Sequence, residues 1–176
     1  MQNKKCVFFD RDGVINKRII DSYVTKQSEF EINLDILPIL KFCDDNNFLK
    51  IIITNQQGIG KSMMNEMDLE SVHNFMNNIL LENQISTFDD IYFASELKNT
   101  EPFRRKPSPK MLLEAMKKYD LQKQDCILIG DSKSDIDSAV NADIMSIFYS
   151  IIEYEEANFS SQNTEEILTY LTTNFI

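Results

Sequence analysis

The segment Cys6-Val-Phe-Phe-Asp10-Arg-Asp12-Gly13-Val-Ile-Asn16 places a short apolar run directly before two carboxylates. The four consecutive apolar residues 6–9 are typical of a strand that is buried on both faces. Asp10 follows at the end of that strand, and Gly13 lets the backbone turn sharply while staying clear of a bound anion. We therefore expect a buried strand that delivers Asp10 and Asp12 into a functional loop.

Similar apolar runs recur along the chain, separated by segments with helical spacing. The expected strands cover residues 6–9, 48–53, 88–93, 126–129 and 144–149. Helices are expected over 68–82, 109–119 and 164–172 and near Asp135, with Asp68, Ser108 and Asn163 as N-cap residues. Strands that alternate with helices, without hairpin signals, predict an α/β fold: a Rossmann-like parallel sheet with helices on both faces. Because no linker divides the chain, residues 1–176 are expected to form one domain.

Three of the expected strands end in polar residues, namely Asp10, Thr54 and Asp131. In a parallel sheet the carboxyl ends of the strands share one edge, and the site of such folds lies there. Of two carboxylates two residues apart, such as Asp10 and Asp12, one can attack phosphorus while the other protonates the leaving oxygen and then deprotonates water. Asp10 and Asp131 would supply the pair of carboxylates that Mg²⁺ prefers.

Charge and hydropathy exclude several classes of function. The 176 residues include 28 acidic and 18 basic side chains, and the net charge of −10 argues against a nucleic-acid partner. No apolar run approaches the roughly 18 residues of a membrane span, and the first run is too short for a signal peptide. We expect a cytoplasmic protein that acts on a small molecule and does not bind membranes. Four basic residues nevertheless gather within 103–110, where Lys106 is suited to meet a phosphate.

Histidine and cysteine are scarce in this chain. The single histidine, His73, falls beside the apolar face of the helix expected over 68–82, which favours a partly buried structural role. The three cysteines, Cys6, Cys43 and Cys126, are an odd number and lie in apolar surroundings. They are expected to be small buried hydrophobic residues rather than a disulfide framework.

Four segments, in this order, resemble the four motifs of the haloacid-dehalogenase-like (HAD) phosphatase superfamily. Within it, they are most similar to the branch of D,D-heptose 1,7-bisphosphate and histidinol-phosphate phosphatases. The segments are Asp10-Arg-Asp-Gly-Val-Ile-Asn16, Thr54-Asn-Gln-Gln-Gly-Ile-Gly60, Arg105-Lys-Pro-Ser-Pro109, and Gly130-Asp131 with Asp135. The resemblance extends over roughly residues 5–150, so it covers most of the chain.

The resemblance implies a role for each matching residue. Asp10 would be the nucleophile and Asp12 the general acid and base. Mg²⁺ would be held by Asp10, Asp131 and the backbone carbonyl of Asp12, with Asp135 supporting these ligands. The residues implied to bind the phosphoryl group or the substrate are Thr54, Asn55, Arg105 and Lys106.

The sequence departs from this branch at one loop. Many members carry zinc ligands in a Cys-x-His and Cys-x-Cys pattern before the Arg-Lys-Pro motif, and the matching positions here are Ala94, Glu96, Pro102 and Arg104. No zinc is therefore expected, and the 94–104 loop must be held by other means. The segment 17–34 is too short for a folded cap domain. A site without that cap is open, which suits a substrate that brings its own bulk or a partner that covers the site. The resemblance implies D-glycero-D-manno-heptose 1,7-bisphosphate as the substrate, with histidinol phosphate and small polyol or amino-alcohol phosphates as alternatives.

Two other functions compete with a phosphatase. The segment Asn55-Gln-Gln-Gly-Ile-Gly60-Lys61-Ser62 departs from the P-loop of nucleotide kinases only at Asn55, where that pattern has glycine. A kinase, however, leaves Asp10 and Asp12 without a role. The second alternative is a non-catalytic phosphate-binding protein on the same fold. A Mg²⁺-dependent phosphomonoesterase that forms an aspartyl phosphate uses all four motifs, and it is the predicted function.

Overall fold

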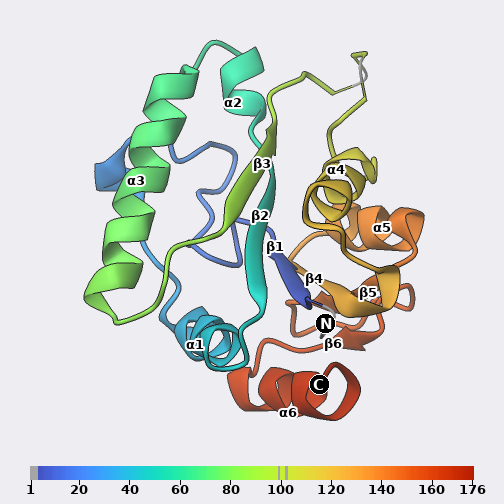
Figure 1. Cartoon of the computed structure of the whole chain (residues 1–176). Coiled ribbons are helices and arrows are strands. Elements are labelled where there is room, and N and C mark those ends of the chain that lie inside the picture. The colour runs from blue at the N-terminus through green and yellow to red at the C-terminus, as the bar shows by residue number, and fades with distance from the viewer. Residues whose placement is uncertain (1–3, 99, 102) are drawn as a thin grey trace.

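The computed structural model describes residues 4–98, 100–101 and 103–176, and a parallel sheet runs through its centre (Figure 1). The six strands lie in the order β3-β2-β1-β4-β5-β6, and every neighbouring pair is parallel. Their bounds are β1 Cys6–Phe9, β2 Leu49–Asn55, β3 Asp90–Ala94, β4 Cys126–Gly130, β5 Met145–Phe148 and β6 Phe159–Ser160. After β1 the chain adds β2 and β3 on one side of it, and then crosses over to add β4, β5 and β6 on the other side. The carboxyl ends of β1 and β4 therefore flank a switch point, where ligands of such sheets bind.

Helices cover both faces of the sheet, as Figure 1 shows. They are α1 Leu37–Asp45, α2 Gln57–Gly60, α3 Glu66–Glu82, α4 Lys110–Tyr119, α5 Lys133–Ala142 and α6 Thr164–Asn174. Successive side chains of β1 point to opposite faces of the sheet, so the hydrophobic core has two parts. Val7 and Phe9 pack with α1, α3 and α6 on one face, whereas Cys6 and Phe8 pack with α4 and α5 on the other. The predicted α/β fold with helices on both faces is confirmed.

The ends of the elements differ from the expectation in several places. Strand β2 continues through Asn55, so Thr54 lies inside the strand and not after it. Helix α1 and strand β6 were not anticipated, and β6 has only two residues, too few to show a period. Asp68 is not the N-cap of α3: Asn65 is, and Asp68 closes a capping box from the third helical position.

The other two N-cap predictions had different outcomes. Helix α4 begins at Lys110 after Pro109, and Ser108 does not cap it. Asn163 is the N-cap of α6 as expected, because its side chain accepts hydrogen bonds from the backbone amides of Glu165 and Glu166.

The three cysteines are buried and free, which confirms their structural role. None of the helices in the described part of the chain combines the length and apolar character that a bilayer crossing requires.

Candidate active site

The predicted site residues gather at the carboxyl edge of the sheet. Asp10 follows β1, Thr54 lies near the end of β2, and Asp131 follows β4. Strand β1 pairs with β2 and β4, so these three positions are neighbours. A cavity of about 620 Å³ opens over this edge, and seven of the predicted residues line it: Asp10, Asp12, Thr54, Asn55, Arg105, Lys106 and Asp135. The eighth, Asp131, lines an adjoining hollow with Gly13 and Arg18.

Lys106 is a buried cation at the floor of this cavity. Its Nζ lies 2.7 Å from Oδ1 of Asp10 and 2.6 Å from Oδ1 of Asp135, and it donates to the carbonyl oxygen of Ile53 at 2.6 Å. Although burial disfavours the ammonium, the two carboxylates raise the pKa of Lys106. Asn55 fixes the backbone on either side of it, accepting from the Lys106 amide at 2.9 Å and donating to its carbonyl at 3.3 Å.

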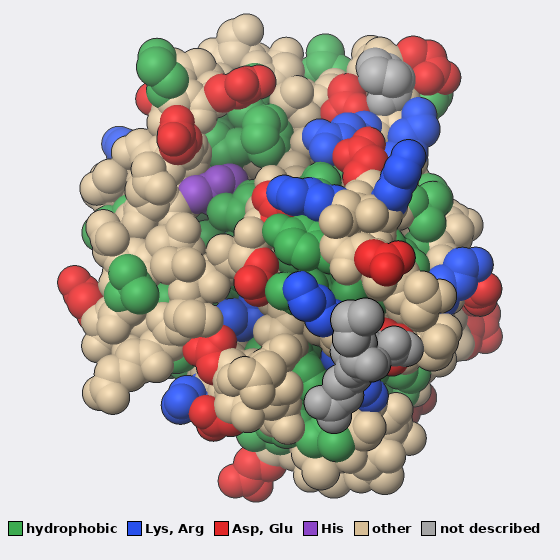
Figure 2. Space-filling model, in the orientation of Figure 1, with side chains coloured by type: hydrophobic (Ala, Val, Ile, Leu, Met, Phe, Trp, Pro, Cys, Tyr) green, Lys and Arg blue, Asp and Glu red, His purple; other side chains and the backbone are tan. Residues whose placement is uncertain are grey.

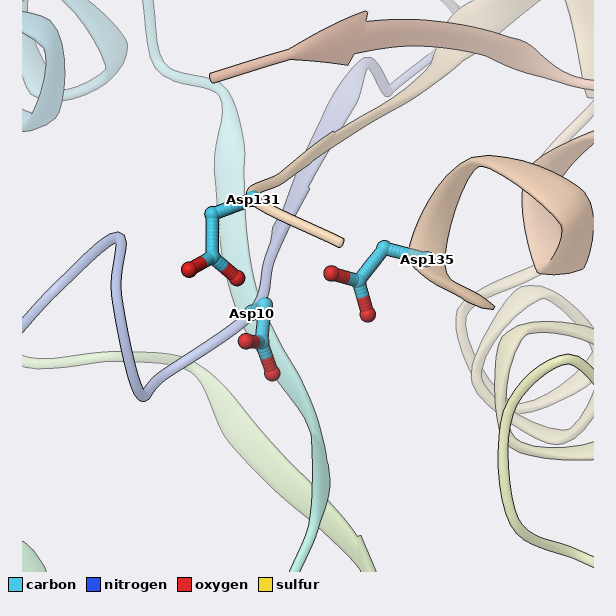
Figure 3. A group of neighbouring side chains, drawn as sticks. All are labelled: Asp10, Asp131 and Asp135. Carbon is cyan, nitrogen blue, oxygen red and sulfur yellow. The ribbon is translucent and has the colours of Figure 1, made fainter. Parts of the chain in front are cut away.

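Asp10, Asp131 and Asp135 form a cluster of carboxylates that point toward one another (Figure 3). One oxygen of each lies within 4.8 Å of the others. Burial raises the pKa of Asp10 above its usual value, against the effect of Lys106. Burial and the neighbouring Asp10 likewise raise the pKa of Asp131, against the effect of Arg18. Such a cluster holds more negative charge than its surroundings neutralise, which is the environment of a divalent cation site.

Asp135 also has a structural role at the start of α5. Its Oδ2 accepts from the Ser132 backbone amide at 2.9 Å and from Ser132 Oγ at 2.7 Å, completing a capping box. Its Oδ1 faces Lys106. The carboxylate is therefore held on both sides. It ties helix α5 to Lys106 in the cavity. Asp135 can therefore cap the helix and also support the proposed metal ligands.

The side chain of Asp12 accepts hydrogen bonds from three residues, and the charge of Arg11 does most to lower its pKa. Arg11 Nη2 lies 2.9 Å from Oδ1 and 2.8 Å from Oδ2 of Asp12. Asn16 donates to Oδ1 at 3.0 Å and Gln56 donates to Oδ2 at 2.9 Å. Although burial acts against the charged form, the guanidinium of Arg11 and these hydrogen bonds hold the pKa of Asp12 below its usual value. In this arrangement Asp12 is ionised, as a base must be.

Four residues around these aspartates were given no role in the site by the sequence. Arg11 and Gln56 are fully buried, and His73 Nε2 lies 3.2 Å from Arg11 Nη1. Gln56 also donates to Thr54 Oγ1 at 2.9 Å, which fixes the hydroxyl of the predicted phosphate ligand. The fourth, Arg18, bonds to Asp131 and to the Asp12 carbonyl. One signal was available: Arg11 stands between two carboxylates in an apolar segment, where an arginine needs buried partners.

The 94–104 loop is held by an arginine at one of the four positions compared with zinc ligands. The backbone amide of Arg104 donates to Oε1 of Glu96 at 3.0 Å, and Nη1 of the Arg104 side chain donates to the Phe93 carbonyl at 2.7 Å. Its Nη2 forms an ion pair with Glu114 of α4 at 2.6 Å. Ala94 is the last residue of β3, and Pro102 lies outside the described residues. Arg104 thus ties the loop both to β3 and to α4.

The P-loop interpretation of 55–62 is wrong. Residues Gln57–Gly60 form the helix α2, so the backbone does not make an open loop around a phosphate before the helix starts. Lys61 comes after this helix, and its Nζ lies 5.2 Å from the ring centroid of Tyr23 and 3.3 Å from the Tyr23 hydroxyl. The lysine therefore lines the mouth of the cavity over Asp10 and does not lie at a helix N-terminus.

Known proteins match the chain over most of its length. The chain is 36% identical over 168 residues to D-glycero-alpha-D-manno-heptose-1,7-bisphosphate 7-phosphatase of Campylobacter jejuni, a match that covers 94% of this chain and 95% of that protein. It is 31% identical over 144 residues to D-glycero-beta-D-manno-heptose-1,7-bisphosphate 7-phosphatase of Helicobacter pylori, covering 82% of each. These relatives agree with the predicted branch.

Solved structures with a similar fold include a phosphatase named for the same substrate. A crystal structure of D,D-heptose 1,7-bisphosphate phosphatase from B. bronchiseptica, complexed with magnesium and phosphate, has a TM-score of 0.84 and 20% identity to this chain. The likeness covers 96% of this chain and 98% of that one. The family model for haloacid dehalogenase-like hydrolases matches residues 17–149. The chain belongs to the haloacid dehalogenase-like hydrolase family and is one of its phosphatases.

Proposed function

We propose that this phosphatase removes one phosphate from a sugar bisphosphate of the D-glycero-D-manno-heptose 1,7-bisphosphate kind, with Mg²⁺ and through an aspartyl phosphate on Asp10. One observation carries the proposal. Asp10 lies at the floor of a cavity of about 620 Å³, paired with the buried ammonium of Lys106, and Asp12 lines the same cavity. A nucleophile, a proton-transfer group and a counter-charge thus face the space that a phosphate ester would occupy.

The chemistry divides between the two aspartates. A carboxylate oxygen of Asp10 attacks phosphorus, the bond from phosphorus to the sugar oxygen breaks, and Asp12 gives its proton to that oxygen. Asp12 takes up this proton from solvent when the anionic phosphate enters, because a nearby negative charge raises the pKa of a carboxyl group. Water then attacks the aspartyl phosphate and gives its proton to Asp12. Phosphate leaves, and Asp10 is a carboxylate again.

The remaining residues stabilise charge on the phosphoryl group. The Lys106 ammonium, 2.7 Å from Asp10, places a positive charge beside the phosphoryl group, and the hydroxyl of Thr54, which accepts from Gln56, lines the same cavity. Fixed donors of this kind contribute more in a buried site than in water, because they need no reorganisation when the reaction occurs. Arg105 and Asn55 line the cavity beside them.

The residues present fit Mg²⁺. Asp10 and Asp131 offer carboxylate oxygens, and burial together with neighbouring carboxylates raises the pKa of both, so a divalent cation would relieve the repulsion among these groups. The backbone carbonyl of Asp12 already accepts from a cation, the guanidinium of Arg18. Asp10, Asp131 and the Asp12 carbonyl would hold the ion, supported by Asp135. When bound, Mg²⁺ neutralises charge on the phosphate and orients it for in-line attack.

The choice of a bisphosphate rests on the cavity mouth and on the relatives. Arg18, Lys61 and Arg105 line the cavity together with polar groups such as Ser22 and Tyr23. These cations exceed what one phosphate at Asp10 and Lys106 requires, and they suit a second phosphate on the same sugar. The relatives from Campylobacter jejuni and Helicobacter pylori are named for this substrate, with opposite anomers. We further infer that residues 1–176 act as one domain without a separate cap, and that residues 18–24 line one side of an open site.

Phosphate release from a panel of substrates tests the proposal. The panel contains both anomers of D-glycero-D-manno-heptose 1,7-bisphosphate, the corresponding 7-monophosphate, histidinol phosphate and glycerol phosphate, each with and without Mg²⁺. We expect one bisphosphate anomer to have the highest kcat/KM, by on the order of 10²-fold over the monophosphate, because the second phosphate adds charge-assisted hydrogen bonds. A higher kcat/KM for histidinol phosphate or glycerol phosphate would contradict the proposed substrate.

One variant and one control test the role of Asp10 independently of the substrate. Asp10→Asn lacks the nucleophile and should lose all measurable turnover of every substrate, by a factor on the order of 10⁴ or more. Lys41→Ala, on the exposed face of α1, is the matched control for handling and should keep the kinetics of the unmodified protein. Turnover that survives in Asp10→Asn would show that another group attacks phosphorus.

A further inference from the structure

We propose that His73 is a positioning residue for the phosphatase reaction, which acts through the guanidinium of Arg11 on the carboxylate of Asp12. The inference rests on the proposed role of Asp12 in proton transfer. His73 itself does not line the cavity over Asp10. It lies on α3, is 8% exposed, and borders a separate groove with Leu69, Ile91 and Phe93. Figure 2 shows the histidine, in purple, in a hollow beside apolar side chains.

Arg11 connects His73 to Asp12 with a single rigid group. Its side chain has no exposed surface, and its donors are distributed over three residues. Nε and Nη2 donate to Asp12, Nη2 also donates to Oε1 of Gln56 at 3.2 Å, and Nη1 lies 3.2 Å from Nε2 of His73. A guanidinium is planar, with its N–H groups in a fixed fork. An acceptor at the Nη1 end therefore sets the direction in which Nε and Nη2 face Asp12.

His73 can serve as this acceptor only when its ring is neutral. Burial and the adjacent Arg11 charge lower the pKa of His73 to about 3, so the ring carries no charge at neutral pH. Arg11 has donors and no acceptor, so Nε2 of His73 must offer its lone pair to Nη1. The ring proton is then on Nδ1. This assignment of the tautomer follows from the hydrogen bond and can be measured directly.

The contact matters for proton transfer because it fixes how firmly Asp12 is held. Arg11 bonds to both carboxylate oxygens of Asp12, so a turned guanidinium changes the orientation of the group that protonates the leaving oxygen. Without the His73 acceptor, one buried N–H of Arg11 loses its partner, and the guanidinium must move to satisfy it. The predicted defect is in proton transfer to the leaving group and not in phosphate binding.

Leaving groups that differ in basicity reveal such a defect. An alkyl phosphate needs its leaving oxygen protonated, whereas 4-nitrophenyl phosphate releases a phenolate that needs little help. We expect His73→Phe, which removes the acceptor, to lower kcat for a sugar phosphate by on the order of tenfold to 10²-fold with KM changed by less than about twofold. With 4-nitrophenyl phosphate the loss in kcat/KM, which excludes the later hydrolysis of the aspartyl phosphate, should stay below about threefold. His73→Gln, which keeps an acceptor, should recover most of kcat.

The controls distinguish a positioning role from a structural one. Asn74→Ala alters the next residue of α3 and borders the same groove, and it should leave both substrates unaffected. His73→Phe in an Asp12→Ala background should add no further loss, because the effect of His73 passes through Asp12. Equal losses with both substrates, or an additive loss in the double variant, would overturn the inference.

A measurement without turnover tests the tautomer. His73 is the single histidine of the chain, so its ring nitrogens give one set of ¹⁵N signals. We expect the pattern of a neutral ring protonated at Nδ1, and a proton on Nε2 would contradict the inference. Asp12→Ala is the reference for the proposed function. If it lowers kcat/KM, which reports only the steps up to departure of the leaving group, equally for both substrates, the acid role of Asp12 is wrong. A leaving-group effect in Asp12→Ala but not in His73→Phe rejects only the role of His73.

Discussion

Arg18 donates a hydrogen bond from Nη2 to Oδ1 of Asp131 at 2.8 Å, and it donates to the backbone carbonyl of Asp12 from Nη2 at 3.0 Å and from Nε at 3.2 Å. Asp131 and the Asp12 carbonyl are two of the three proposed ligands of Mg²⁺. The guanidinium therefore neutralises the same oxygens that the metal would, and it is half exposed, which leaves it free to turn away. Arg18 and Mg²⁺ are expected to compete.

Removal of Arg18 should strengthen metal binding. We expect Arg18→Ala to lower the Kd for Mg²⁺ by about three- to tenfold, because the ion no longer displaces an ion pair worth about 1 kcal/mol. Titration calorimetry without substrate measures this directly. Lys17→Ala is the matched control, since Lys17 is exposed and pairs with Glu31 away from the ligands. An unchanged or weaker affinity in Arg18→Ala would show that Arg18 does not compete with the metal.

Gly13 makes room for the Asp131 carboxylate. Its φ is 109°, in the region that favours glycine, and a Cβ built on it would lie 1.8 Å from Oδ2 of Asp131. Gly13→Ala should therefore displace Asp131, weaken Mg²⁺ binding by more than about tenfold and destabilise the fold by about 1–3 kcal/mol. Calorimetry and urea unfolding measure the two effects. Gly58→Ala is the control, because there the nearest contact of an added Cβ would be 3.1 Å, to the Tyr23 ring, and metal binding should persist. Normal metal binding in Gly13→Ala would show that Gly13 is not needed to place Asp131.

Much of the fold and the outline of the site could be predicted because both depend on local patterns. Buried strands appear as apolar runs, and a parallel sheet brings their carboxyl ends together. Asp10, Thr54 and Asp131 were therefore expected at one edge, and they are neighbours there. The short strand β6 and the exact N-cap of α3 escaped, because a two-residue strand has no period and Asn65 and Asp68 both suit the start of a helix.

The partners of the site residues could not be predicted, because they come from distant parts of the chain. The apolar spacing of α3 indicated that His73 is buried, but not that its ring meets Arg11, which lies on the loop after β1. The basic cluster near Lys106 was expected beside the site, but the sequence did not show which of its side chains enter the cavity. Lys106 and Arg105 line the cavity, while Arg104 turns to Glu114 and the Phe93 carbonyl. Such choices depend on the packed neighbours of each side chain.

Arg104 is expected to act on substrate affinity through the loop that it holds. Arg104→Ala removes the ion pair to Glu114 and the hydrogen bond to the Phe93 carbonyl, so the segment leading to Arg105 and Lys106 becomes less ordered. We expect KM to rise by about three- to tenfold with kcat changed by less than about threefold, because substrate binding then includes the ordering of the loop. Steady-state kinetics on the preferred substrate measures this.

A neighbouring basic residue provides the control for Arg104. Lys110 is exposed at the start of α4 and carries the same charge, so Lys110→Ala should leave KM within about twofold if the effect of Arg104 comes from its contacts and not from its charge. Glu114→Gln, which weakens only the ion pair to α4, should have an intermediate effect. Equal KM values for Arg104→Ala and Lys110→Ala would indicate that general electrostatic attraction matters and that the loop is held by other contacts.

The buried ring of His73 should make the free energy of unfolding depend on pH. Its pKa is about 3 in the folded protein, owing to burial and to Arg11, against an ordinary value of 6.5. Between these values the unfolded chain binds a proton that the folded protein does not, so this group lowers stability as the pH falls below 6.5. The loss from pH 7.5 to pH 5 should be about 2 kcal/mol.

The comparison with His73→Gln isolates this contribution from those of the aspartates. The raised pKa values of Asp10 and Asp131 act in the opposite direction, since these folded carboxyl groups bind protons as the pH falls, but they are common to both proteins. The difference in unfolding free energy between the two proteins, from urea titrations, should therefore shift by about 2 kcal/mol in favour of His73→Gln on going from pH 7.5 to pH 5. A constant difference would mean that His73 accepts a proton in the folded state, and Nε2 could then no longer accept a hydrogen bond from Arg11.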